Sequence, residues 1–96
     1  MARKAVRRSR VASLHDEAYA RFVGALVLER KKSGLSQQAV ADKLGWQQSI
    51  VAKIETAQRR IDIVELIRFA GAVGFDAAKS VRELRRSMIE AGEISE

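Results

Sequence analysis

One short segment of the chain carries side chains of the types and spacing that read nucleic-acid bases. If residues 47–56 form a helix, four of them share its polar side: Gln48, Ser49, Ala52 and Lys53. A glutamine amide can pair with adenine through two hydrogen bonds, serine can bond to several base edges, and lysine can reach guanine or phosphate. The small alanine leaves room for close approach to a groove. By pattern alone, the segment also fits a bundle helix with an ordinary solvent-facing side.

Positioning this face requires a second short helix and a tight turn. Ser36 is a good N-cap for a helix that reaches Lys43, and Gly45 allows the left-handed conformation of a sharp reversal. The turn itself spans Leu44-Gly45-Trp46. Trp46 could stack on sugar or phosphate groups, or it could fill the gap between the helices. The segment from Leu35 to Glu55 therefore predicts a helix-turn-helix.

The rest of the chain also has helical periodicity, and no segment alternates long enough to form a sheet. Ser13 is expected to cap the first helix, with Asp16 completing a capping-box pattern, and this helix should end near Ser33. Its inward side is a stripe of large residues: Tyr19, Phe22, Val23, Leu26 and Val27. Further helices are expected over residues 36–43, 47–56, 63–73 (capped by Asp62) and 77–91. The fold class predicted is all-α, a compact bundle of five short helices.

Charge is concentrated at the N-terminus. The chain has a net charge of +6, of which +5 lies in the first thirteen residues: Arg3, Lys4, Arg7, Arg8 and Arg10. We interpret residues 1–12 as a flexible basic arm, residues 13–75 as the DNA-binding domain and residues 76–96 as a C-terminal helix. A cationic arm on a nearly neutral body favours a polyanionic partner, although a solvated tail or contact with anionic lipid also fits.

The composition argues against several other classes of protein. There is no cysteine and only one histidine, His15, so thiolate and multi-histidine metal sites are not expected. The carboxylates are scattered, and neither a GxxxxGK[ST] nor a GxGxxG phosphate loop occurs. There is no apolar stretch long enough for a membrane span or a signal peptide. We therefore expect no enzyme activity, cofactor, metal or small-molecule substrate, and a cytoplasmic, nucleoid-associated location.

The segment GLSQQAVADKLGWQQSIVAKIE resembles the helix-turn-helix of the phage-repressor (Cro/cI, xenobiotic-response-element-like) family of small bacterial regulators. The resemblance covers about residues 26–75, and it includes Arg30, Leu44-Gly45 and Glu55. It implies a lambda-repressor-like fold that binds double-stranded DNA. The chain departs from the family at Thr56-Ala57, where members often carry Asn-Gly, and at Ile61-Asp62, where a proline is common.

The resemblance also implies roles for individual residues. Base contacts are expected from the polar side of the third helix: Gln48, Ser49, Ala52 and Lys53. Contacts with the DNA backbone are expected from Gln37, Gln47, Arg59 and Arg60. The charge of the arm, which lies outside the resemblance, predicts further backbone or minor-groove contacts from Arg3, Lys4, Arg7, Arg8 and Arg10. Arg30 and Glu55 match an internal ion pair across the motif, with a structural role.

The last expected helix carries an apolar stripe that includes Val81, Leu84 and Met88. It could pack on the domain's own core, or it could form a homodimer contact. Because one recognition helix reads only a few base pairs, family members usually bind two half-sites as symmetric dimers.

We therefore predict a homodimeric repressor of an inverted-repeat operator. The alternative is an antitoxin or adaptor whose main role is to bind a partner protein such as a toxin or RNA polymerase. An RNA-binding protein is a further alternative, but the chain lacks aromatic stacking platforms.

Overall fold

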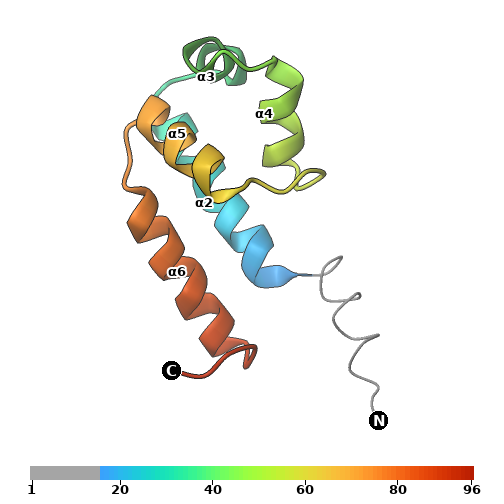
Figure 1. The fold of residues 1–96 in the computed structure, drawn as a ribbon, viewed down its shortest axis with the longest axis vertical. Coiled ribbons are helices and arrows are strands. Elements are labelled where there is room, and N and C mark those ends of the chain that lie inside the picture. Colours follow the sequence, from blue (N-terminus) through green and yellow to red (C-terminus); the bar gives the residue numbers. More distant parts are fainter. Residues whose placement is uncertain (1–15) are drawn as a thin grey trace.

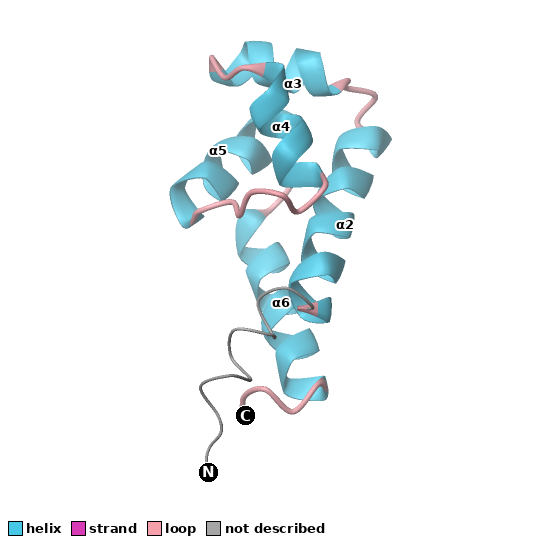
Figure 2. Ribbon diagram, turned by 90° about the vertical axis from the view of Figure 1, so that its right-hand side faces the viewer, coloured by secondary structure: helices cyan, strands magenta, loops and turns pink. Residues whose placement is uncertain are grey.

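The computed structural model describes residues 16–96, and this part of the chain contains helices and no strands. The helices are α2 (Glu17–Lys32), α3 (Gln37–Leu44), α4 (Gln48–Glu55), α5 (Ile63–Val73) and α6 (Ala77–Glu90). Helices α2 and α6 lie side by side, and α3, α4 and α5 gather around the C-terminal half of α2 (Figures 1 and 2). The predicted all-α fold of five helices is confirmed for the described residues.

The N-terminus of α2 differs from the expectation. Its N-cap is Asp16, whose Oδ1 accepts a hydrogen bond of 3.0 Å from the backbone N–H of Tyr19. The prediction that Asp16 occupies the third position of a helix already begun was therefore wrong. The carboxylate satisfies one of the free N–H groups of the first turn, so the helix begins directly after it. The predicted cap, Ser13, lies outside the described residues.

The other helix ends follow the local sequence signals. The Ser36 hydroxyl caps α3 by accepting from Ala39 N–H at 3.0 Å. Asp62 caps α5, and its carboxylate and that of Glu65 form a reciprocal capping box. Gly45 ends α3 with φ 72° and Gly74 ends α5 with φ 103°, in the left-handed region where a side chain would be strained. The chain therefore reverses where the glycines allow it.

The core lies between α2 and the α3–α4–α5 cluster. It contains most of the predicted stripe of α2, with Val27 half-buried at its edge. The largest fully buried side chains come from several helices: Leu26, Val40, Val51, Ile54 and Phe69. Burying apolar area of this kind supplies most of the driving force for a domain of this size. The core therefore holds α4 rigidly against α2 and α3.

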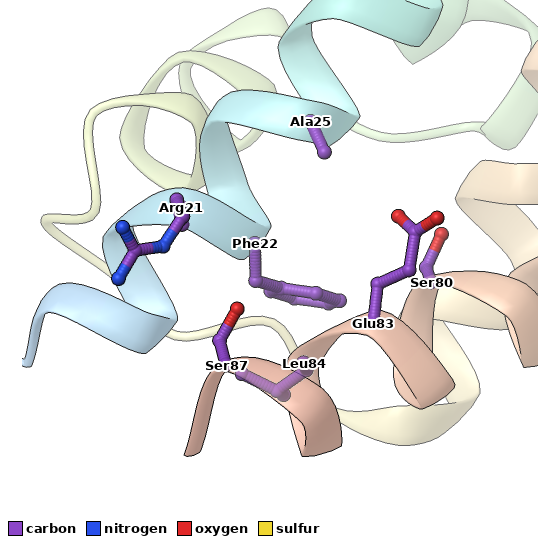
Figure 3. Close-up of a pocket in the computed structure, with 7 residues that line it drawn as sticks. All are labelled: Arg21, Phe22, Ala25, Ser80, Glu83, Leu84 and Ser87. Atoms are coloured by element: carbon purple, nitrogen blue, oxygen red, sulfur yellow. The ribbon is translucent and has the colours of Figure 1, made fainter. Parts of the chain in front are cut away.

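Helix α6 is seated less deeply than the others, and none of its residues is buried. Leu84 projects from α6 toward the ring of Phe22 on α2, beside a crevice of about 230 Å³ (Figure 3). The crevice is lined by Arg21, Phe22, Ala25, Ser80, Glu83, Leu84 and Ser87. The part of the predicted stripe that contains Leu84 thus packs on the domain's own core. Among residues 16–96, no helix has both the length and the apolar character needed to cross a bilayer.

Candidate nucleic-acid interface

The turn between α3 and α4 fixes how the predicted base-reading helix leaves the core. After Gly45, the backbone N–H of Trp46 donates to the Ala41 carbonyl at 2.9 Å, which closes the end of α3. Trp46 is half-buried and packs against the core. Of its two possible roles, the structure supports the filling of the gap between helices.

Helix α4 has one buried and one accessible side. Val51 and Ile54 are fully buried, so they hold the helix on the core. The structure brings the four predicted base-contacting residues to the other side: Ser49 and Lys53 are exposed, and Gln48 and Ala52 are half-buried. Gln47, the N-cap of α4, is exposed beside them and makes no side-chain cap bond. This accessible side carries amide, hydroxyl and ammonium groups on a narrow helix.

Arg30 and Glu55 form an ion pair that joins α2 to the end of α4. Arg30 Nε lies 2.6 Å from Glu55 Oε2 and its Nη2 lies 2.8 Å from Oε1, while Nη1 donates to the Leu35 carbonyl at 2.8 Å. The side chains are only 10% and 4% exposed, respectively. The hydrogen bond with Glu55 raises the pKa of Arg30 above its ordinary value, against the opposing effect of burial. The pair therefore locks the recognition motif to the first helix.

Two glutamines extend this pair toward the accessible side of α4. Gln37 Nε2 donates to Glu55 Oε1 at 2.9 Å, and Gln48 Nε2 donates to Gln37 Oε1 at 2.7 Å. The sequence predicts separate roles for Gln37 and Gln48 and does not predict their contact with each other. Gln37 is the first residue of α3, and Gln48 is the first residue of α4. Their positions at the starts of two helices joined by a tight turn were the only indication of this contact in the sequence.

The loop after α4 uses its two arginines within the molecule. Arg59 makes two hydrogen bonds to the Glu65 carboxylate, of 3.0 and 2.7 Å, and these raise the pKa of Arg59 and lower that of Glu65. Arg60 lies 3.6 Å from Asp16 Oδ2 and 4.2 Å above the centre of the Tyr19 ring. A phosphate contact by either arginine would have to compete with these partners. The predicted contacts of the arm, from Arg3 to Arg10, lie outside the described residues.

The comparisons with known proteins address the family directly. A family model described as "Helix-turn-helix" matches residues 27–79, just over half of the chain. The chain belongs to this helix-turn-helix family. This helix-turn-helix protein is also similar to a solved structure described as an XRE-family like protein from Pseudomonas syringae pv. tomato str. DC3000. The two share 29% sequence identity over 81% of this chain and 95% of the other, with a TM-score of 0.73. A comparison with curated proteins finds no match.

Together, the family match and the structural neighbour identify a DNA-binding transcription regulator. They also confirm the resemblance to the Cro/cI and xenobiotic-response-element-like regulators. Within the described residues, no group of three or more His, Cys, Asp or Glu side chains is arranged to hold a metal ion.

Proposed function

We propose that this helix-turn-helix protein is a repressor that binds an inverted-repeat operator as a homodimer. The observation that carries the proposal is the accessible side of α4, which presents the exposed Ser49 and Lys53 and the half-buried Gln48. A helix anchored on one side by Val51 and Ile54 can enter the major groove without distorting the core. Gln48, Ser49, Ala52 and Lys53 would contact base edges there.

Contacts with the DNA backbone would set the register of α4 in the groove. Gln37 uses one amide hydrogen for Glu55 and keeps a second, which suits a phosphate oxygen. Gln47, the N-cap of α4, and Arg60, in the loop after α4, are exposed, and Arg59 is partly exposed. The arm residues Arg3, Lys4, Arg7, Arg8 and Arg10 would add charge-driven contacts that do not depend on sequence.

The first test replaces Gln48 with alanine. We expect Gln48→Ala to weaken binding to the cognate operator by about 1–3 kcal/mol and to leave binding to random DNA nearly unchanged. Gln38→Ala is the matched control, because Gln38 is exposed on α3 and bonds Asp42 at 2.8 Å instead. Titrations with both DNAs at one salt concentration provide the comparison. An equal loss on cognate and random DNA would assign Gln48 to the backbone.

We propose the dimer surface on α5 and α6, and we define this α5–α6 face by its exposed apolar residues: Ile63, Val64, Ile67 and Val81. Their exposed fractions are 60%, 51%, 58% and 40%, respectively. Two of them, Ile63 and Val81, line a hollow of about 320 Å³ together with residues that include Ile61, Leu66 and Leu84. A contiguous apolar patch of this kind is typical of an interaction surface, and a two-fold axis would pair it with itself. Leu84 would then lie between the exposed residues of this face and the domain's own core.

The second test replaces Ile67 with aspartate. Because Ile67 is 58% exposed, the domain should remain folded, and sedimentation should show a monomer that binds a single half-site weakly. Leu28→Asp is the control, since Leu28 is 57% exposed but lies on α2. If Ile67→Asp dimerises as the wild type does, another surface joins the protomers.

The antitoxin or adaptor alternative is supported by the same α5–α6 face, which a partner protein could also cover. A variant with Gln48, Ser49 and Lys53 all replaced by alanine separates the two functions. If the protein is an adaptor, this variant should still bind the partner protein and keep its effect. If the protein is a repressor, this variant should lose repression.

A further inference from the structure

We infer that the hollow beside the α5–α6 face binds a small carboxylate with an apolar body, whose acid group pairs with Arg60 and Tyr19. This ligand site goes beyond DNA binding and does not depend on it. Only the expected effect of the ligand on the operator complex rests on the proposed function.

The wall of the hollow suits an apolar body. Its lining comes from α2, from the loop after α4, from α5 and from α6. The volume of about 320 Å³ is at the lower end of the range of ligand pockets, which is about 300–1,000 Å³. Most of the wall is apolar: Phe22, Ile61, Ile63, Leu66, Val81 and Leu84. A small apolar body placed here would release water from this surface, which favours binding.

Arg60 lines the same hollow and has unused hydrogen-bond donors. Its Nη2 lies 3.6 Å from Asp16 Oδ2, too far for a hydrogen bond, and its guanidinium donates to no other group within residues 16–96. The guanidinium lies 4.2 Å above the centre of the Tyr19 ring, and this cation–π contact holds it in place. Arg59, by contrast, already makes two hydrogen bonds to Glu65. Arg60 is therefore a positioned cation that can bind an anion.

The Tyr19 hydroxyl supplies a second donor. Its oxygen accepts from the Ile61 N–H at 3.1 Å, so its own hydrogen remains, and the described part of the chain offers this hydrogen no acceptor. Tyr19 is only 9% exposed, and buried polar groups are normally paired. Tyr19 and Ile61 both line the hollow. Two unused donors beside one apolar hollow favour a ligand whose polar end only accepts, as a carboxylate does.

Two acidic residues lie near the expected acid group, and both are engaged as helix caps. Asp16 Oδ1 accepts from the Tyr19 N–H at 3.0 Å, and Asp62 Oδ1 accepts from the Glu65 N–H at 2.7 Å. The positive end of each helix dipole offsets the charge of its cap. These carboxylates therefore oppose a bound anion less than uncapped ones would.

NMR titration of the full chain tests the site without DNA. The probes are octanoate and its uncharged analogue octanol, and the signals are the methyl groups of Ile63, Leu66, Val81 and Leu84. We expect saturable shifts at these methyl groups and an affinity for octanoate at least about ten-fold higher than for octanol, because hydrogen bonds to a charged group are strong.

Three variants locate the acid group. Arg60→Gln should lower the affinity for octanoate to about that for octanol. Tyr19→Phe should weaken octanoate several-fold and leave octanol binding unchanged. Arg68→Gln is the matched control, because Arg68 is exposed on α5 and does not line the hollow. The site is overturned if the four methyl groups show no saturable shift, if the two probes bind equally well, or if Arg60→Gln keeps the preference for octanoate.

A titration with operator DNA separates this site from the proposed function. Ile63 and Val81 also belong to the α5–α6 face, and Arg60 is a proposed backbone contact, so an occupied hollow should weaken operator binding several-fold. The comparison is saturating octanoate against sodium chloride at equal ionic strength. If octanoate binds in the hollow and leaves both operator affinity and dimerisation unchanged, the ligand site stands. The proposed dimer face and the proposed DNA contact of Arg60 then fail.

Discussion

At the scale of single residues, Ala57 has an unusual backbone conformation. It follows the C-cap of α4 with φ 62°, in the left-handed region that glycine adopts easily and alanine does not. The turn is nevertheless well bonded, because the N–H groups of Ala57 and Gln58 donate to the carbonyls of Ile54 and Lys53. The hydrogen bonds of the turn hold Ala57 in place against its own preference.

We therefore expect Ala57→Gly to stabilise the protein. Relief of left-handed strain of about 1–2 kcal/mol is partly offset by the greater freedom of glycine in the unfolded chain, which leaves a gain of about 0.5–1 kcal/mol. Ala20→Gly is the control, because Ala20 is exposed within α2 and should lose about 0.5–1 kcal/mol. Urea denaturation without DNA measures both variants. A destabilised Ala57→Gly protein would show that the turn is not strained.

For single residues, only part of the candidate site could be predicted from the sequence. Helical spacing was sufficient to place Ser49 and Lys53 on the accessible side of α4, because that depends only on the period of the helix. The bonds from Gln48 to Gln37 and from Arg59 to Glu65 could not be predicted in this way. They depend on how side chains meet across a turn or a loop, and several partners are within reach of a long flexible side chain.

At the scale of elements, the start of α5 combines a capping box with an ion pair to the preceding loop. Glu65 accepts from the Asp62 backbone at 3.1 Å as part of the capping box, and it also accepts both bonds from Arg59. The hydrogen bonds from Arg59 are the main reason that the pKa of Glu65 lies below its ordinary value. One carboxylate thus connects the loop after α4 to the helix that carries the α5–α6 face.

This arrangement predicts how stability changes with pH. Because the folded-state pKa of Glu65 is depressed, its contribution is present above the ordinary value of 4.5 and is lost as the pH falls through the lower folded-state value. Glu65→Gln should be less stable than the wild type at pH 7, and the difference should shrink in acid. Thermal unfolding at pH 7 and at roughly pH 3 tests this, with Glu90→Gln on α6 as the control. A difference that is the same at both pH values would contradict the role given to Glu65.

The boundaries of the elements were the most predictable feature of the fold. The helix caps bond to backbone groups only a few residues away, as at Ser36, Gly45, Asp62 and Gly74. Both partners of each capping interaction are therefore visible in the local sequence. The start of α2 was mispredicted because Ser13 and Asp16 are both competent caps, and local pattern does not rank them. The seating of α6 could not be predicted either, since an apolar stripe is the same whether it faces its own core or another molecule.

At the scale of the whole molecule, most of the net charge precedes the described domain. If about three of the five basic residues of the arm meet phosphates in each protomer, a dimer would neutralise about six phosphates more. Each phosphate steepens the dependence of log K on log salt by about 0.9, so deletion of residues 2–12 should flatten this slope by about five units. Cognate and random DNA should lose affinity together. Unchanged affinity and slope after the deletion would identify the arm as a solvated tail.

The contact between Tyr19 and the loop after α4 has a consequence for how such an arm would act. The Tyr19 hydroxyl accepts from the Ile61 N–H at 3.1 Å and Arg60 covers its ring, so the start of α2 and the exit of α4 form one corner. Asp16, the first of the described residues, therefore lies beside the loop that leaves the recognition helix. If α4 occupies a groove, basic residues joined to this corner by a short stretch of chain would meet DNA at an effective concentration of about millimolar. Even contacts with dissociation constants of about a millimolar would then be occupied much of the time.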